Sequence, residues 1–162
     1  MELDLAVLAD AATMDASGKL NLLGVFDRIQ SREFPVRHGR IALALRFSAD
    51  PEEVGVHEVA IHLVGPSQRE LLRLDGRMEL RTTPGGTPEG MRLPQILNLD
   101  GIVFPEPGDY TFRILVDGRQ VSSLGLTVEK VRVTPPVATP TPMGDPPPLV
   151  IFQPPGGGGV EA

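Results

Sequence analysis

Apolar and polar residues alternate with a period of two through most of residues 1–133, and this pattern constrains the fold more than any other feature. Successive side chains of a β-strand point to opposite faces, so the alternation predicts strands with one dry face and one wet face. A convincing helical period is found nowhere in this region. Two runs show the pattern most clearly: Ile41, Leu43, Leu45 and Phe47, and Tyr110, Phe112, Ile114 and Val116. The chain is therefore predicted to be all-β.

Turn-forming residues divide the alternating region into separate strands. Asp117-Gly118, for example, is typical of a type I′ turn that joins two antiparallel strands. The expected strands are about eight in number, at roughly 3–13, 20–30, 40–49, 56–65, 69–81, 95–104, 110–117 and 120–132. Such a set predicts an antiparallel two-sheet sandwich, either jelly-roll-like or immunoglobulin-like, with a closed barrel as the lesser alternative.

Glycines inside the expected strands raise a second question. The tripeptide Leu-Asp-Gly occurs at 74–76 and again at 99–101. A tight turn at each would leave strand fragments of about four residues, so a glycine bulge within a continuous strand is the favoured interpretation. The segment 20–29 is apolar on both faces, which predicts a bulge at Gly24 or burial on two sides.

The composition changes after about residue 133. Residues 134–162 hold nine of the 17 prolines, and proline cannot donate a hydrogen bond to a strand ladder. We therefore expect a sandwich domain at 1–133 and a Pro/Gly-rich extended tail at 134–162. One apolar cluster lies between prolines in this tail: Leu149, Val150, Ile151 and Phe152. It is either a chance apolar stretch or a short docking strand for an exposed sheet edge, on this subunit or a neighbour.

Charge and composition exclude several kinds of partner and site. The 15 basic and 21 acidic residues give a net charge of −6, which argues against nucleic acid and anionic membrane surfaces as partners. The lack of cysteine excludes disulfides, thiolate catalysis and cysteine-based zinc sites. The start has no basic region before an apolar run, as a signal peptide would, and no stretch approaches the roughly 20 apolar residues of a spanning helix. A cytoplasmic location is therefore expected.

Residues that could carry chemistry do not form a recognisable motif. His57 and His62 are five apart, so on one strand they face opposite sides and cannot bind one metal together. No serine lies in a nucleophile elbow, and no glycine-rich phosphate loop joins a strand to a helix. The acids of 50–53 are explained by an ordinary turn better than by calcium. We predict no catalytic, metal or cofactor site, and no enzyme.

The stretch Asp15–Ile29, DASGKLNLLGVFDRI, combines charged residues and glycines, a composition also found in catalytic loops. Asp15 and Gly18 are turn residues, because Asp bonds nearby backbone groups and glycine adopts positive φ. For the strand that follows, we expect Asp27 to accept loop N–H groups and Arg28 to bridge to a carboxylate. With Gly24, these residues form a structural signature rather than an active site.

Several segments together resemble one family of small bacterial proteins of unknown function. They are LADAA at 8–12, GKLNLLGVFDRI at 18–29, FP at 34–35, LRF at 45–47, QILNLDGIVF at 95–104 and PGDYTFRILVDG at 107–118. The resemblance covers about residues 3–131 and leaves the proline-rich tail outside. It implies a single all-β domain, and it brings no activity, cofactor or ligand residue with it.

The sequence therefore favours a non-enzymatic β-sandwich that acts in protein interaction or assembly. Its partner would be a protein, either a different one or a further copy of this chain in a homo-oligomer, with the C-terminal tail as tether or docking segment. The alternative is a small-ligand or glycan-binding module that uses the loops 50–55 and 82–94. Trp is absent and Tyr occurs once, so the aromatic platforms on which sugars stack are scarce.

Overall fold

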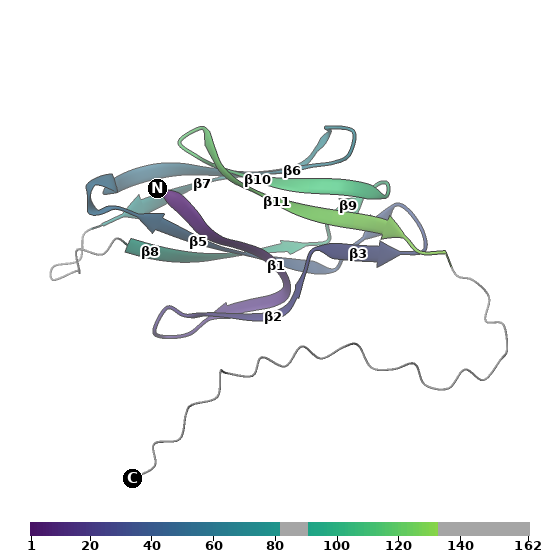
Figure 1. Ribbon diagram of the computed structural model, residues 1–162, viewed down its shortest axis with the longest axis horizontal. Helices are drawn as coiled ribbons and strands as arrows, with labels where there is room; N and C mark the ends of the chain where they lie inside the picture. Colours follow the sequence, from purple (N-terminus) through teal and green to yellow (C-terminus); the bar gives the residue numbers. More distant parts are fainter. Residues whose placement is uncertain (82–90, 133–162) are drawn as a thin grey trace, which may run out of the picture.

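The computed structural model describes residues 1–81 and 91–132, and these are built almost wholly from strands (Figure 1). The elements are β1 (Glu2–Met14), β2 (Leu20–Phe26), β3 (Arg28–Ser31), β4 (Val36–Arg37), β5 (Arg40–Ala49), the short 3₁₀ helix η1 (Pro51–Glu53), β6 (Gly55–Val64), β7 (Glu70–Leu80), β8 (Met91–Asp100), β9 (Val103–Phe104), β10 (Gly108–Val116) and β11 (Arg119–Lys130). No helix in this part of the chain has the length and apolar character needed to cross a membrane.

Two sheets form the body of the molecule. Sheet A has the strand order β2-β1-β5-β8, and sheet B has the order β3-β11-β10-β6-β7. Neighbouring strands are antiparallel except β3, which runs parallel to β11. Within the described ranges no hydrogen-bonded ladder joins sheet A to sheet B, so the arrangement is a sandwich and not a closed barrel. The predicted all-β, two-sheet fold is confirmed.

The strand order identifies the sandwich as immunoglobulin-like. In such domains, strands G, F, C and C′ are neighbours in one sheet and strands A, B and E in the other. Here β11-β10-β6-β7 form the first set and β1-β5-β8 the second. A tyrosine corner is also present, because the hydroxyl of Tyr110, early in β10, donates to the Glu106 carbonyl at 2.6 Å. This scheme leaves over β2 in sheet A, β3 in sheet B, and the separate two-stranded pair β4-β9.

The core lies between the two inner faces. The inward side chains of β5 and β10 are at most 5 % exposed, as predicted, but Ala42 and Ala44 on the outer side of β5 are also fully buried. Phe104 and Tyr110 meet edge to face with ring centroids 5.0 Å apart. Among the described residues no polar or charged residue is fully buried, although the Nε2 atom of His62 is buried without a hydrogen-bond partner. The buried Tyr110 hydroxyl has the Glu106 carbonyl as its partner. Burial of each large apolar side chain contributes about 1.5–3 kcal/mol to folding.

The strand expected at 20–30 is in fact two strands in different sheets. β2 ends at Phe26 in sheet A, and β3 begins at Arg28 in sheet B. The chain crosses between sheets at Asp27, whose carbonyl accepts a hydrogen bond from the Thr127 N–H at 2.9 Å. Phe26 then packs on the core from sheet A and Ile29 packs on it from sheet B. The change of sheet therefore accounts for Ile29, whereas Leu23 and Val25, on the other face of β2, are exposed.

The expected glycine bulges are wrong. The β1–β2 register is constant from Leu8 opposite Phe26 to Met14 opposite Leu20, so Gly24 introduces no extra residue. The register of β6 and β7 likewise passes Gly76 without a shift. At 99–101 the structure takes the turn that was not favoured, because β8 ends at Asp100 and Gly101 has a φ of 68°.

Candidate functional site

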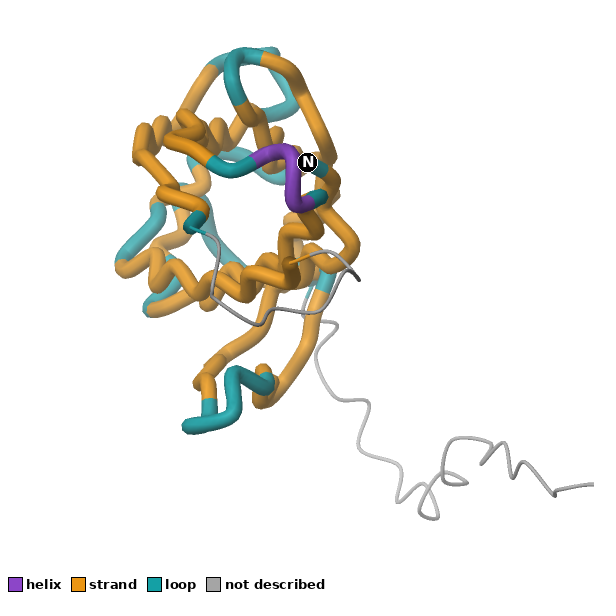
Figure 2. Tube along the Cα trace, turned by 90° about the vertical axis from the view of Figure 1, so that its left-hand side faces the viewer, coloured by secondary structure: helices purple, strands orange, loops and turns teal. Residues whose placement is uncertain are grey.

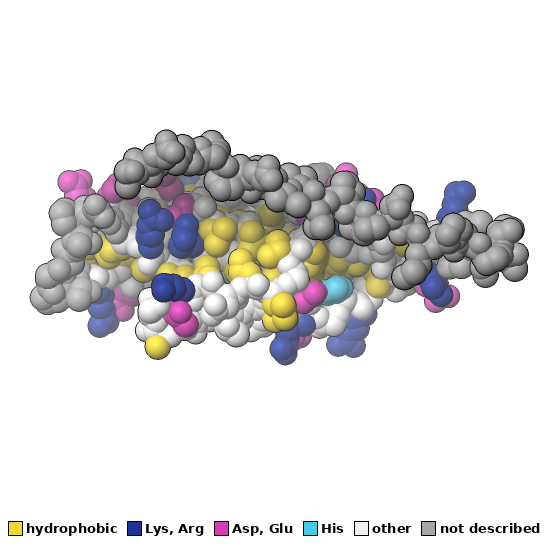
Figure 3. Space-filling model, turned by 60° about the horizontal axis from the view of Figure 1, so that its bottom comes forward, with side chains coloured by type: hydrophobic (Ala, Val, Ile, Leu, Met, Phe, Trp, Pro, Cys, Tyr) yellow, Lys and Arg dark blue, Asp and Glu magenta, His cyan; other side chains and the backbone are white. Residues whose placement is uncertain are grey.

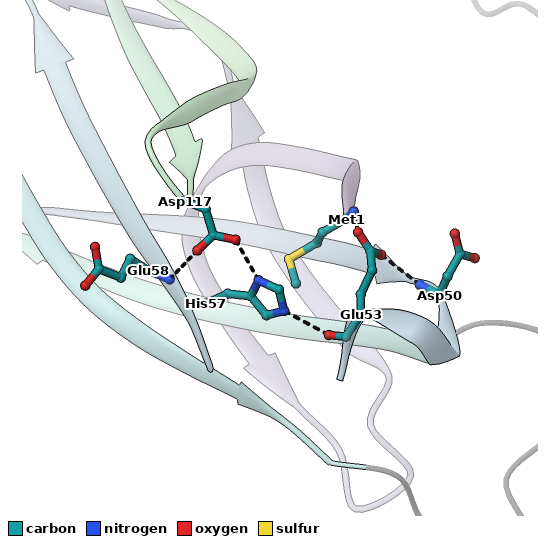
Figure 4. A network of polar contacts seen from close by, with 6 residues as sticks. All are labelled: Met1, Asp50, Glu53, His57, Glu58 and Asp117. Atoms are coloured by element: carbon teal, nitrogen blue, oxygen red, sulfur yellow. Dashed lines mark hydrogen bonds and ion pairs between the residues drawn. The ribbon is translucent and has the colours of Figure 1, made fainter. Parts of the chain in front are cut away.

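A polar network closes one end of the sandwich, where β6 begins (Figure 4). His57 Nδ1 lies 2.7 Å from a carboxylate oxygen of Asp117, in the turn between β10 and β11. His57 Nε2 lies 2.8 Å from the carbonyl oxygen of Glu53 in η1. Both ring nitrogens therefore face acceptors, an arrangement that suits a doubly protonated imidazolium.

The partners of His57 are themselves held in place. The second carboxylate oxygen of Asp117 accepts the Glu58 N–H at 2.9 Å, and Asp117 and Gly118 have φ values of 49° and 76°. Two positive φ values in succession are those of the predicted type I′ turn. The Glu53 carboxylate accepts the Asp50 N–H at 2.9 Å and pairs with the amine of Met1.

These contacts shift three pKa values. The hydrogen bond to Asp117, and then that to the Glu53 carbonyl, raises the pKa of His57. The same hydrogen bond to His57, with the Glu58 N–H, lowers the pKa of Asp117. The amine of Met1, followed by the Asp50 N–H, lowers the pKa of Glu53. Each shift favours the charged form that the network holds.

The network is a cap on the fold and a poor catalytic site. A histidine that acts as general base must present a free ring nitrogen to a proton, whereas both nitrogens of His57 are occupied. The adjacent surface hollow, of about 370 Å³, has no serine, threonine, cysteine or lysine among its lining residues. The acidic loop 50–55, one half of the ligand-site alternative, is likewise engaged in internal contacts through Glu53 and the N–H of Asp50.

The pKa directions predict how stability depends on pH. The stabilisation from His57 is complete below its ordinary pKa of 6.5 and is lost as the pH rises through the raised value. The stabilisation from Glu53 is complete above its ordinary pKa of 4.5 and is lost as the pH falls through the lowered pKa. We expect a melting temperature that is highest between these limits and declines towards alkaline pH. Calorimetry of the wild type and of His57→Gln measures the melting temperature across this pH range. Parallel alkaline declines in the two proteins would exclude His57 as the cause.

Metal-binding side chains do not converge in the described ranges. No group of three or more His, Cys, Asp or Glu side chains in these ranges lies close enough to hold an ion. His57 and His62 are on opposite faces of β6, as the five-residue spacing predicts. His62 Nδ1 lies 3.4 Å from a carboxylate oxygen of Glu70 on β7.

The β1–β2 hairpin extends away from the body of the sandwich (Figures 1 and 2). β1 pairs with β5 through Glu2–Ala9 and with β2 through Leu8–Met14. The second half of β1 therefore has β2 as its one strand partner among the described residues. A two-stranded ribbon is only marginally stable in water, so this hairpin depends on the sandwich at its base and on its own turn.

The turn of the hairpin is tightly organised. One carboxylate oxygen of Asp15 accepts hydrogen bonds from the N–H of Ser17 at 2.8 Å, its hydroxyl at 2.7 Å and the N–H of Lys19 at 3.0 Å. These donors, the Ser17 hydroxyl first, lower the pKa of Asp15. Gly18 takes a φ of 81°, a conformation that glycine adopts at little cost. The turn role expected for Asp15 and Gly18 is confirmed.

The remaining signature residues are spread along the hairpin and do not converge on one point. Gly24 has a φ of 65° and lies against the Asp10 side chain on β1. Asp27 accepts the Thr127 N–H through its carbonyl, and none of the described residues donates a hydrogen bond to its carboxylate, so the expected contact is not found among them. Arg28 forms the expected bridge, with Nη1 3.1 Å from a carboxylate oxygen of Glu129 on β11. Spread out in this way, these residues shape the fold and do not form a reaction centre.

The hairpin also carries the most exposed large apolar side chain of the described chain. Leu23 is 71 % exposed and Val25 is 60 % exposed. They lie beside Ala11 and Ala9 on the outer face of sheet A, and the apolar surface continues across the sheet. Leu5, Val7 and Ile96 continue it as half-buried side chains, whereas Ala9, Ala42 and Ala44 on the same face are fully buried. Figure 3, which brings the side of sheet A forward, shows apolar side chains along the middle of this face and charged ones at its borders.

Three of the expected features lie outside the described residues. These are the docking segment Leu149–Phe152, the rest of the tail at 134–162, and residues 82–90 of the loop proposed for ligand binding. The end of that loop, 91–94, belongs to β8.

Two features were not predicted from the sequence. The His57–Asp117 contact joins residues 60 apart, and nothing in the linear sequence pairs them. The exposed β2 edge did leave a signal, because LNLLGVF contains no charge and no proline. An apolar segment of this kind suggests a buried strand, whereas β2 is an edge.

The fold and the projecting hairpin define an immunoglobulin-like β-sandwich with an added apolar arm. The chain belongs to the family of unknown function DUF6941, whose model matches residues 4–129. This match confirms the resemblance to an uncharacterised family. No curated protein matches the chain.

Two solved structures are among those with a similar arrangement. One is the alkylpurine DNA glycosylase AlkC of Pseudomonas fluorescens bound to DNA with an abasic site analogue, at 11 % identity and a TM-score of 0.41. The alignment covers 78 % of this chain but only 30 % of that protein. The other is an immunoglobulin-like protein of Pseudomonas aeruginosa, at 10 % identity and a TM-score of 0.38, covering 79 % of this chain and 95 % of that one. Likenesses at this level carry no information about function.

Proposed function

We propose that the protein is a non-enzymatic interaction module that binds another protein through β2 and the outer face of sheet A. The C-terminal tail serves as a tether or docking segment. The exposure of Leu23 and Val25 at the border of an apolar sheet face carries this proposal. Contiguous exposed apolar surface with a polar rim is typical of protein interaction sites.

The shape of the hairpin supports the same function. β2 has a free edge, so a partner can add a strand by backbone hydrogen bonds while Leu23 and Val25 supply apolar contact. The Asp15 turn fixes the tip of the arm, which lowers the entropic cost of binding. The net charge of −6 favours a protein partner over nucleic acid.

Site-specific photo-crosslinking in the native cell tests the proposal. A crosslinking residue at Val25 should capture another protein, whereas the same residue at Val56 on β6 should not. The two valines are matched, at 60 % and 62 % exposure, and lie on opposite sheets. Capture from neither position, or equally from both, would overturn the proposed surface.

The captured protein, once purified, allows a quantitative test. Val25→Ser is expected to weaken its binding at least about tenfold, since a lost buried methyl pair costs more than about 1.4 kcal/mol. Val56→Ser should leave the dissociation constant unchanged. Isothermal titration calorimetry measures both. Equal affinity of the two variants would contradict a role for β2.

A further inference from the structure

β2 is unlike the other edge strands of the two sheets. Edge strands usually carry charges or prolines that prevent another strand from adding to them. Of the four edge strands of sheets A and B, β3 has Arg28, β8 has Arg92 and Pro94, and β7 has five charged residues along its length. β2, with the sequence LNLLGVF, has neither a charge nor a proline. This edge is therefore open to strand addition.

The two faces of β2 define what kind of strand fits beside it. Leu23 and Val25 are exposed on the outer face, while Leu20, Leu22 and Phe26 are half-buried on the other. A strand added to this edge would extend both faces. It must therefore be apolar on both sides, whereas an ordinary amphipathic strand would place polar groups against one of them.

We propose that Leu149–Phe152 of the same molecule adds to the free edge of β2. Alternation places Leu149 and Ile151 on one side of such a strand and Val150 and Phe152 on the other, so both sides are apolar. Prolines 146–148 and 154–155 limit the added strand to about this length, because proline donates no hydrogen bond. This inference rests on the proposed function. A docked tail covers the same surface of β2 that an external protein partner would bind.

The place where the chain leaves the sandwich puts Leu149–Phe152 within reach of β2. The N–H of Val131 donates to the carbonyl of Ser31 at 2.8 Å, so the chain leaves beside β3, which is separated from β2 by one residue, Asp27. Seventeen residues lie between Val131 and Leu149, and seven of them are proline. In an extended polyproline conformation they reach about 50 Å, whereas β2 is about 23 Å long. Tethering also gives the segment a high effective concentration at this edge.

The conformation of β2 favours a short strand over a second copy of β2. Gly24 has a φ of 65°, which interrupts the extended edge after Leu23. In a symmetric pairing of two β2 strands centred on Leu23, both interruptions would meet near the middle of the new ladder. A four-residue strand can pair with Leu20–Leu23 without crossing Gly24. The geometry therefore points to the tail segment.

Paramagnetic relaxation in the full-length chain tests this placement. The chain has no cysteine, so Gly157→Cys allows a single nitroxide to be attached just beyond the segment. We expect loss of the amide signals of Leu20–Phe26 and retention of those of β7. A matched sample with Val150→Asp and Phe152→Asp should recover the β2 signals, because charge in the added strand prevents docking.

A mixture of isotope-labelled chains and nitroxide-labelled unlabelled chains identifies the source of the tail. Signal loss at β2 within one chain, and none in the mixture, supports docking in the same molecule. Loss in the mixture alone would replace this proposal with docking between copies, and loss at no strand or at another edge would overturn it. Neither negative result bears on the proposed protein-binding role of Val25, which the crosslinking experiment tests separately.

Discussion

Tyr110→Phe is expected to lower the free energy of unfolding by about 1–2 kcal/mol, and Tyr110→Ala by about 3–5 kcal/mol. The first change removes only the hydroxyl that donates to the Glu106 carbonyl at 2.6 Å. The second also empties the buried space that the ring fills against Phe104. Burial raises the pKa of the Tyr110 hydroxyl, so it stays a neutral donor throughout the physiological range.

Urea unfolding followed by circular dichroism measures both losses. Phe112→Leu serves as the control, because it changes an equally buried ring on the same strand without touching the corner. A loss of under about 1.5 kcal/mol is expected for it, as for other conservative core changes. If Tyr110→Phe were as stable as the wild type, the hydroxyl would not tie β10 to the preceding turn.

The fold was largely predictable because its signal is local. Each strand of a sandwich has one dry face, so alternation in segments such as 40–49 specifies which side chains enter the core. The choice between immunoglobulin-like and jelly-roll topology depends instead on which strands are neighbours. Alternation carries no information on pairing, and the single tyrosine of the corner was the one local clue to it.

The crossing at Asp27 shows where local reasoning fails. Alternation assigns side chains to the two faces of one sheet, but it does not reveal that the chain changes sheets between Phe26 and Arg28. The same limit applied to the glycines. Asp-Gly ends a strand at 100–101 and continues one at 75–76, although the tripeptides are identical. Tertiary contacts, not the local sequence, decide between the two.

The polar cap was beyond sequence reasoning for a related reason. His57 meets Asp117 because β6 pairs with β10 in a register that places Glu58 beside the turn. The turn of the β1–β2 hairpin was partly predictable from the sequence, because Asp15 and Gly18 favour a turn by their own chemistry. That β2 is an edge depends on the order of strands in sheet A, which the sequence does not specify.

Gly24→Ala is expected to destabilise the protein by about 2–3 kcal/mol, more than the same change at Gly18. Both glycines have positive φ, which costs an alanine about 1–2 kcal/mol. A Cβ added at Gly18 would meet no atom within 4 Å, whereas a Cβ added at Gly24 would collide with the Asp10 carboxylate, which would have to move. Gly125→Ala is the control, since that position has neither a positive φ nor a close neighbour, and it should be neutral or slightly stabilising.

A double-mutant cycle with Asp10→Ala separates the two costs at Gly24. The steric part should disappear in the Asp10→Ala background, which leaves the backbone part and brings the loss close to that of Gly18→Ala. Chemical denaturation of the four proteins gives the coupling energy. If Gly24→Ala cost the same stability in the Asp10→Ala background, backbone strain alone, and not the contact with Asp10, would require glycine at position 24. Equal losses at Gly24, Gly18 and Gly125 would contradict the hairpin geometry itself, because only the first two adopt the left-handed conformation.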